Sequence, residues 1–283
     1  MKFLNIVKST PFQIITYIFA VIGFVFTFVF IAMQFGLLNV KGSNADRNAS
    51  LNIPKTEIIQ DCTDKSKTKC NWSETKEWEI LNAAFKKDAP IINKVAAEVG
   101  VSPRMIVATV APEQIRFFTS NRESFKKYFE PLKILVSLSK FSLGVSGIKQ
   151  ETANKIEEYA NNPTSPFYPG PEATSLIAYK EGVNHDTELY NRLTDEKDHY
   201  YSYLYTALFI KEIESQWAKS GFDVTKKPEV IVTLFNIGFN SSIPNANPTV
   251  AGSSITLGGH TYTYGELGTL IYNSNELSDI FSK

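Results

Sequence analysis

The sequence has few cysteines and no excess of either charge. Cys62 and Cys70 are the only cysteines in 283 residues, and they lie close together in a polar stretch. In an oxidising compartment this pair predicts a disulfide that closes a short loop, and the alternative is two free thiols. The 29 basic residues balance the 29 acidic residues, so the charge gives no reason to expect a nucleic acid as partner.

Motifs of several enzyme classes are missing as well. The histidines His185, His199 and His260 are scattered along the chain and lack the spacing of metal ligands. No second cysteine pair is present, and neither a Gly-x-Ser-x-Gly elbow nor a phosphate-binding loop occurs. We therefore expect neither a metal nor a cofactor.

One long apolar run lies near the N-terminus. From Ile14 to Met33 the residues are apolar, aromatic or glycine except for two threonines, and no charge interrupts them. About 20 such residues at ~1.5 Å each match a bilayer core of ~30 Å, so the run predicts a transmembrane anchor at 12–38. Lysines precede the run, which predicts a cytoplasmic N-terminus at 1–11 and an extracytoplasmic C-terminal part on the cell membrane.

The rest of the chain predicts a linker and one mainly helical domain. Residues 39–72 are polar, whereas residues 73–283 are numerous enough for one sizeable core. Apolar residues recur at helical spacing through most of that domain. The segment SITLGGHTYTYG around Gly258-Gly259 has the pattern of a β-hairpin. The expected fold class is mainly α, with a small C-terminal β-hairpin.

Glu113 is the first candidate catalytic residue. It follows an almost wholly apolar segment from Met105 to Val110, and Pro112 ends or kinks the predicted helix beside it. Cleaving a glycosidic bond requires a carboxyl group that stays protonated, and an apolar setting supplies one because desolvation disfavours the charged form. The alternative is a solvated glutamate at a helix end.

Two glycine-containing segments follow. SLGVSGIKQETA, from Ser142, places Gly144 and Gly147 in a turn ahead of a helix. TLFNIGF places Asn236 and Gly238 at the end of another helix. Glycines in such turns adopt positive φ and let the backbone approach a ligand closely, and an asparagine beside an aromatic ring can bind sugar hydroxyls. The alternatives are an ordinary helix-entry loop and a helix C-cap.

In this order the three segments resemble the motifs of the lysozyme-like lytic transglycosylases, which act on peptidoglycan. That family has a catalytic Glu, then Ser-x-Gly-x-x-Gln-apolar-x-x-x-Thr-Ala, then Ala-Tyr-Asn-x-Gly. The match covers about 89–239 and leaves 240–283 as an extension of a lysozyme-like domain at 73–283. The resemblance implies Glu113 as catalytic acid. The implied substrate contacts are Ser142, Gly144, Gly147, Ile148, Thr152, Phe235, Asn236, Gly238 and, on a cleft-lining helix, Tyr201 and Tyr205.

The resemblance also implies a mechanism that uses a single carboxylate. Ordinary glycosidases use two. In lytic transglycosylases the Glu protonates the leaving oxygen of the MurNAc–GlcNAc bond and then acts as base on the sugar's own 6-hydroxyl. The product is a 1,6-anhydromuramyl end, formed without water. The implied partners are peptidoglycan strands, the membrane and an envelope or secretion assembly.

The sequence departs from the family pattern at three positions. Gln114 stands where the family has Ser, Gly147 where it has Gln, and Phe235 where it has Tyr. Gly147 and Phe235 favour the alternative of a non-catalytic glycan-binding or scaffold protein on the same fold, whereas the retained Glu113 favours an enzyme. A hydrolytic muramidase is a third possibility, and it would need a second carboxylate facing Glu113 across the cleft.

Overall fold

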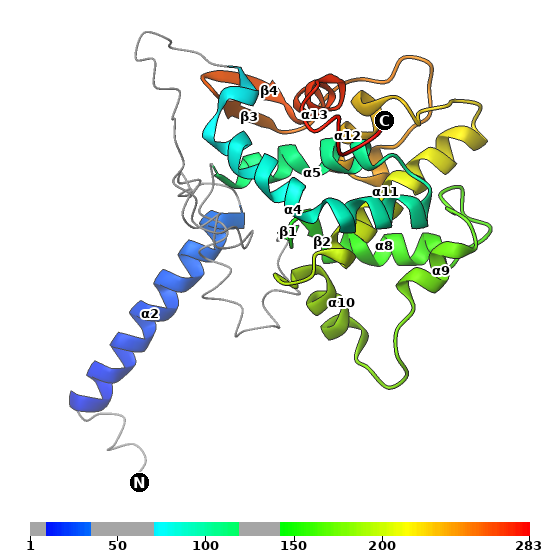
Figure 1. Ribbon diagram of the computed structural model, residues 1–283. Helices are drawn as coiled ribbons and strands as arrows, with labels where there is room; N and C mark the ends of the chain where they lie inside the picture. Colours follow the sequence, from blue (N-terminus) through cyan, green and yellow to red (C-terminus); the bar gives the residue numbers. More distant parts are fainter. Residues whose placement is uncertain (1–9, 35–70, 119–141) are drawn as a thin grey trace. The chain divides into compact units, whose positions relative to one another are not determined.

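The computed structural model describes residues 10–34, 71–118 and 142–283. The chain divides into two compact units, and the described part of the smaller unit is one helix, α2 (Thr10–Gln34). The larger unit holds all the other described elements (Figure 1). Cys62, Cys70 and most of the predicted linker lie outside the described residues, so the disulfide stays a prediction.

The prediction of a transmembrane anchor at 12–38 is wrong. No helix among the described residues is long and apolar enough to cross a membrane. In α2 the side chains are described from 13 to 28, and they are exposed.

The larger unit is mainly helical, as the sequence predicts. Its elements include two antiparallel strand pairs, β1–β2 and β3–β4, which form separate sheets. The helices are η1 (Trp72–Glu74), α4 (Lys76–Val99), α5 (Pro103–Phe118), α8 (Gln150–Ala160), α9 (Glu172–Ile177), α10 (His185–Thr194), α11 (Tyr200–Lys219), α12 (Pro228–Ile237), η2 (Phe239–Ser241) and α13 (Tyr264–Asn273). The strands are β1 (Ser142–Leu143), β2 (Ile148–Lys149), β3 (Ser254–Leu257) and β4 (His260–Thr263).

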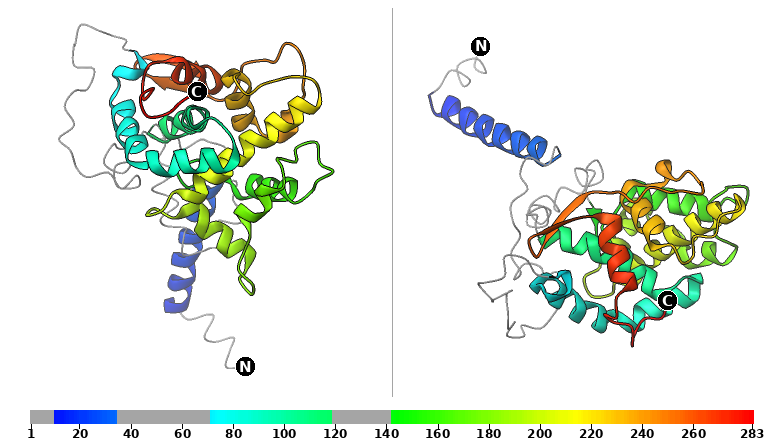
Figure 2. Two further views of the ribbon diagram at one scale, coloured as in Figure 1. Left: turned by 45° about the vertical axis from the view of Figure 1, so that its right-hand side comes forward. Right: turned by 90° about the horizontal axis from the view of Figure 1, so that it is seen from above.

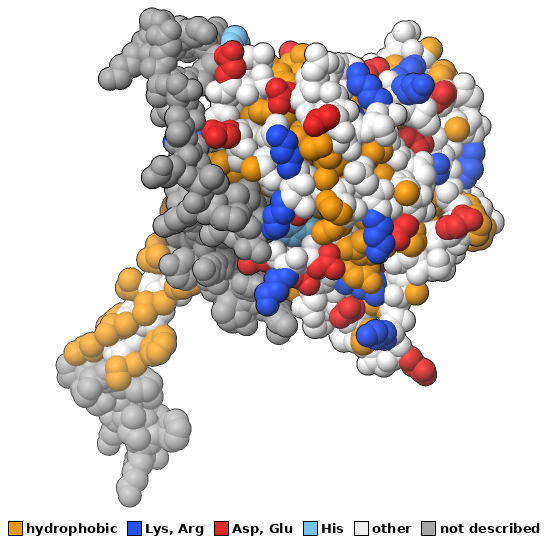
Figure 3. All heavy atoms as spheres, viewed as in Figure 1, with side chains coloured by type: hydrophobic (Ala, Val, Ile, Leu, Met, Phe, Trp, Pro, Cys, Tyr) orange, Lys and Arg blue, Asp and Glu red, His pale blue; other side chains and the backbone are white. Residues whose placement is uncertain are grey.

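Helices α5 and α11 form the centre of this unit. Helices α8, α9 and α10 lie toward one end of it, and α12, α13 and the β3–β4 hairpin lie toward the other (Figures 1 and 2). Fourteen of the 16 residues of α5 are buried, which is the pattern of a helix enclosed by protein on all sides. Basic and acidic side chains are interspersed on the face in Figure 3, in agreement with the balanced composition.

The predicted C-terminal hairpin is confirmed. Ser254 pairs with Thr263 and Leu257 with His260, so Gly258 and Gly259 form the two-residue turn. Both glycines have positive φ, at 57° and 76°, as a tight hairpin turn requires. After the hairpin a capping box, in which the Thr263 hydroxyl accepts from the amide of the third helical residue, starts α13.

Residues after 239 are integrated into the core through Arg104. This side chain is 1% exposed and lies at the start of α5. Its guanidinium donates hydrogen bonds to the carbonyls of Tyr272 at 3.1 Å, Ile271 at 2.8 Å and Ser274 at 2.7 Å, and to that of Glu276. The end of α13 and the segment after it are therefore held against the helix that carries Glu113.

Candidate functional site

Pro112 lies inside α5, so the predicted alternative in which it ends the helix is wrong. Proline has no N–H and leaves the carbonyl four residues earlier, that of Ala108, without its helical donor. Helix α13 packs closely here, since a Cβ on Gly268 would lie 2.7 Å from the Ala108 oxygen. The Tyr264 hydroxyl donates to the next carbonyl, Thr109 O, at 2.9 Å. Packing by α13 thus accommodates the proline, and α5 continues past Glu113.

Glu113 is buried, at 4% exposure, against the loop between β1 and β2. A Cβ on Gly147 would lie 2.6 Å from Oε1 of Glu113 and 2.8 Å from its Cδ, and the φ of Gly147 is +67°. Any side chain here would therefore overlap the carboxylate. Glycine at position 147 has a steric reason, because the loop backbone itself covers one side of the acid.

The same loop is fixed to its neighbours by polar contacts. Gln114 Nε2 donates to the carbonyl of Val145. Ser146 Oγ donates to the carbonyl of Ser202 in α11 at 2.8 Å, and Ser146 N donates to the Ser202 hydroxyl at 3.2 Å. Gln114 thus anchors the loop that covers Glu113.

Asn236 joins the end of α12 to the segment before β3. Its Oδ1 accepts hydrogen bonds from the amide of Ser253 at 2.8 Å and from the Ser253 hydroxyl at 3.1 Å. Its Nδ2 has no hydrogen-bond partner among the described residues and can donate to a ligand. Gly238 follows α12 with a φ of +89°, so the predicted end of this helix is confirmed.

These segments meet in one cavity of about 320 Å³. Segments more than 100 residues apart in the chain contribute to its walls. Phe235 and Phe239 form an apolar part of the wall, and both rings pack against Phe209 of α11, with centroid distances of 5.2 and 4.3 Å. The predicted residues in the lining are Glu113, Gly147, Ile148, Thr152, Phe235, Asn236 and Gly238.

The other four predicted residues lie outside this lining. Ser142 is in β1, paired with Lys149. Gly144, with a φ of +61°, lies against α10, where a Cβ would overlap the Leu193 carbonyl. Tyr205 is fully buried and donates to a carboxylate of α8, and the ring of Tyr201 lies under a guanidinium of α10 at 4.4 Å. The tyrosines of α11 therefore serve packing between helices.

Arg116 is a site residue that the sequence reading missed. Its Nη2 lies 2.6 Å from Oε1 of Glu113, so the surroundings of the acid are not wholly apolar as predicted. Oε2 of Glu113 has no partner among the described residues. The sequence signal for this pair was the i,i+3 spacing of the two residues on one helix.

Burial raises the pKa of the nearby Tyr264 phenol well above its usual value, and the charge of Glu113 raises it further.

Glu151 is the other carboxylate in the lining. Its side chain is 74% exposed and lies 3.6 Å from Lys155 Nζ, one turn further along α8. Within the described ranges, no group of three or more His, Cys, Asp or Glu residues is placed to hold a metal ion.

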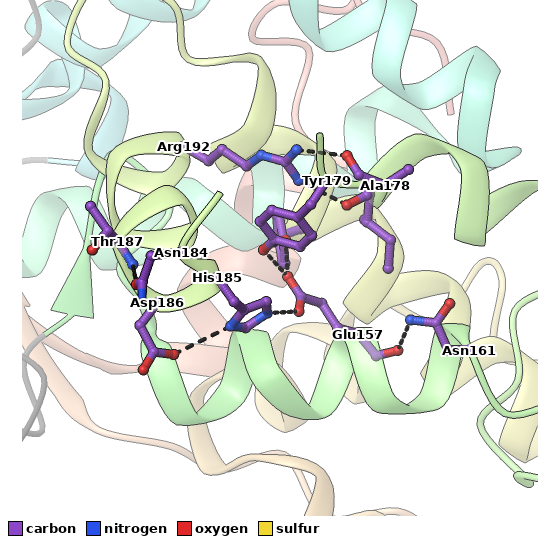
Figure 4. Close-up of polar contacts among 11 residues, drawn as sticks. Glu157, Asn161, Ala178, Tyr179, Asn184, His185, Asp186, Thr187 and Arg192 are labelled. Atoms are coloured by element: carbon purple, nitrogen blue, oxygen red, sulfur yellow. Dashed lines mark hydrogen bonds and ion pairs between the residues drawn. The ribbon is translucent and has the colours of Figure 1, made fainter. Parts of the chain in front are cut away.

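A second polar cluster surrounds Glu157, outside the cleft (Figure 4). Its Oε1 accepts hydrogen bonds from the hydroxyls of Tyr179, at 2.5 Å, and Tyr205. Its Oε2 lies 2.6 Å from Nε2 of His185, and this contact raises the pKa of His185 above its usual value. The guanidinium of Arg192 lies over the Tyr179 ring at 3.9 Å. The cluster joins α8, α10 and α11.

Comparison with known proteins identifies no relative of this chain. No family model matches the sequence, and neither a curated protein nor a solved structure matches it. The function therefore has to be argued from the residues of the cleft.

Proposed function

We propose that this chain is a peptidoglycan lytic transglycosylase that cleaves the MurNAc–GlcNAc bond, with Glu113 as its single general acid and base. The observation that supports the proposal most is the convergence of three distant segments on one cavity around a buried carboxyl group. A glycosidic bond needs a proton donor held in a fixed place beside the sugar. This substrate would place the domain outside the cytoplasm, facing the cell wall.

The cleft residues have distinct roles in this mechanism. Oε1 of Glu113 is held by Arg116, which leaves Oε2 for the substrate. Glu113 gives its proton to the glycosidic oxygen as the bond to C1 breaks. The resulting carboxylate then takes the proton of the 6-hydroxyl as that oxygen bonds to C1. Asn236 Nδ2 is the donor placed for an acetamido or hydroxyl oxygen of the sugar.

A second candidate is a glycan-binding protein without catalysis on the same cleft. The ion pair between Glu113 and Arg116 favours it, because a carboxylate engaged by a guanidinium has to acquire a proton before it can donate one. The glycine and phenylalanine at positions 147 and 235 also lack the polar groups that the family has there.

Digestion of purified peptidoglycan by the full chain separates the two candidates. We expect mass spectrometry to detect 1,6-anhydromuropeptides with the wild type and none with Glu113→Gln. Glu151→Gln is the matched control, because it removes the other carboxylate of the lining, and it should keep most of the product. Glycan binding without product from the wild type would exclude the enzyme and support the second candidate.

A further inference from the structure

The charged side chains of the cleft are not balanced. Three basic residues and two acidic residues line it, although the chain as a whole carries no net charge. The five residues are Glu113, Arg116, Lys149, Glu151 and Lys155.

Two of the three cations are already paired. Arg116 lies 2.6 Å from Glu113, and Lys155 lies 3.6 Å from Glu151. Lys155 is also within 3.5 Å of the side-chain oxygen of Asn240. Lys149 has no ion-pair or hydrogen-bond partner for its ammonium group among the described residues. The cleft therefore contains one positive charge that the described residues do not neutralise.

Lys149 lies close to the reacting end of the cleft. It is two residues after Gly147, whose backbone covers the Glu113 carboxylate. Two residues of extended chain span about 6.6 Å. Ile148 is buried between them, whereas Lys149 is exposed at the end of β2 and lines the cavity. A ligand group that reaches Lys149 would thus belong to the sugar at Glu113 or to its substituent.

We propose that Lys149 is a specificity-determining residue that binds a carboxylate on the substituent of the sugar cleaved at Glu113. This inference rests on the proposed function. A glycan of neutral N-acetylhexosamines offers no group that needs a cation, whereas a muramic acid unit carries an acidic lactyl or peptide substituent. Lys149 therefore makes the cleft prefer acid-bearing glycan over glycan of the same length without free carboxylates.

The test compares two probes that differ only in charge. One is a purified GlcNAc–MurNAc-peptide with free carboxylates, and the other is the same muropeptide with its carboxyl groups amidated. Neither contains the MurNAc–GlcNAc bond, so binding to the full chain is measured by calorimetry without turnover. We expect the wild type to bind the acidic form about threefold to fivefold more tightly, the range of an exposed ion pair. Raising the salt concentration should reduce this preference.

Three variants assign the preference to one side chain. Lys149→Gln should bind both probes equally, and Lys149→Arg should keep the preference because it keeps the charge. Lys226→Gln is the matched control, because Lys226 is an exposed lysine outside the cleft lining, and it should behave as the wild type.

The outcomes separate this inference from the proposed function. Equal binding of the two probes by the wild type, or a preference that survives in Lys149→Gln, overturns the role of Lys149. If the wild type still releases anhydromuropeptides from peptidoglycan in that case, the proposed function stands. A wild type that neither binds the probes nor cleaves peptidoglycan overturns both.

Discussion

Two buried carboxylates, Glu113 in α5 and Glu157 in α8, have opposite surroundings. Glu113 has one cationic partner on one oxygen, no described partner on the other, and a cavity beside it. Glu157 has both oxygens occupied, by one histidine and two tyrosines, and it lies outside the cleft lining. A carboxylate whose acceptor positions are filled from several helices holds those helices together, whereas one with an open position on a cavity can act on a ligand.

Glu212 in α11 provides a third case. It is 0% exposed, and neither of its oxygens has a hydrogen-bond partner within the described part of the chain. Burial raises its pKa well above the usual value, because desolvation disfavours the charged form. It lies outside the lining of the cleft. Burial of a carboxyl group alone therefore does not identify a functional residue.

Gly147→Ala should cause the largest loss of activity. The new methyl group would overlap the Glu113 carboxylate and push it away from Arg116 and the cleft. Because catalytic groups must stay within about 1 Å of their place, we expect product release to fall on the order of 100-fold. Gly182→Ala is the control, since Gly182 also has positive φ, at +80°, but no atom within 4 Å of its Cβ position. Equal losses in both variants would mean that backbone strain, and not the overlap, is responsible.

Glu157→Gln should have the opposite profile. The substitution removes a carboxylate that accepts hydrogen bonds from three side chains. Two of these side chains lie on α10 and α11, and the third lies in the connection between α9 and α10. The free energy of unfolding should therefore fall by roughly 2–4 kcal/mol. The activity per folded molecule should stay near that of the wild type. Chemical denaturation measures the first quantity and initial rates measure the second. A large loss of activity with unchanged stability would place Glu157 in the site.

Glu212→Gln should stabilise the protein, and more so as the pH rises. Above about pH 4.5 the unfolded chain ionises Glu212, but the folded chain keeps it neutral, so the wild type loses stability with rising pH. Glutamine does not titrate, and the free energy of unfolding of the variant at pH 7 should exceed that of the wild type by roughly 1–3 kcal/mol. Unfolding curves at pH 4 and pH 7 measure the difference. An advantage that is the same at both pH values would show that ionisation is not its cause.

Local features of the fold could be predicted from the sequence. The Gly258-Gly259 turn and the end of α12 at Gly238 depend on residues a few positions apart, and both are observed. The position of the cleft was also predictable, because its three segments each carry a glycine or carboxylate pattern.

Contacts between distant helices could not be predicted. The tyrosines of α11 were expected in the cleft, but 13 of the 20 residues of this helix are buried, so its pattern does not say which neighbour each one meets. Arg116 was hidden for a different reason. An arginine three residues after a glutamate on a helix is common, and only the burial of Glu113 distinguishes this pair.

The contact between Arg104 and the carbonyls after α13 has a consequence for the order of folding during synthesis. Arg104 is among the first residues of α5, and its partners lie 167 to 172 residues later in the chain. A guanidinium with 1% exposure cannot leave water until those carbonyls are available. Helix α5, and the acid on it, therefore reaches its final surroundings only after residues 271–276 have left the ribosome.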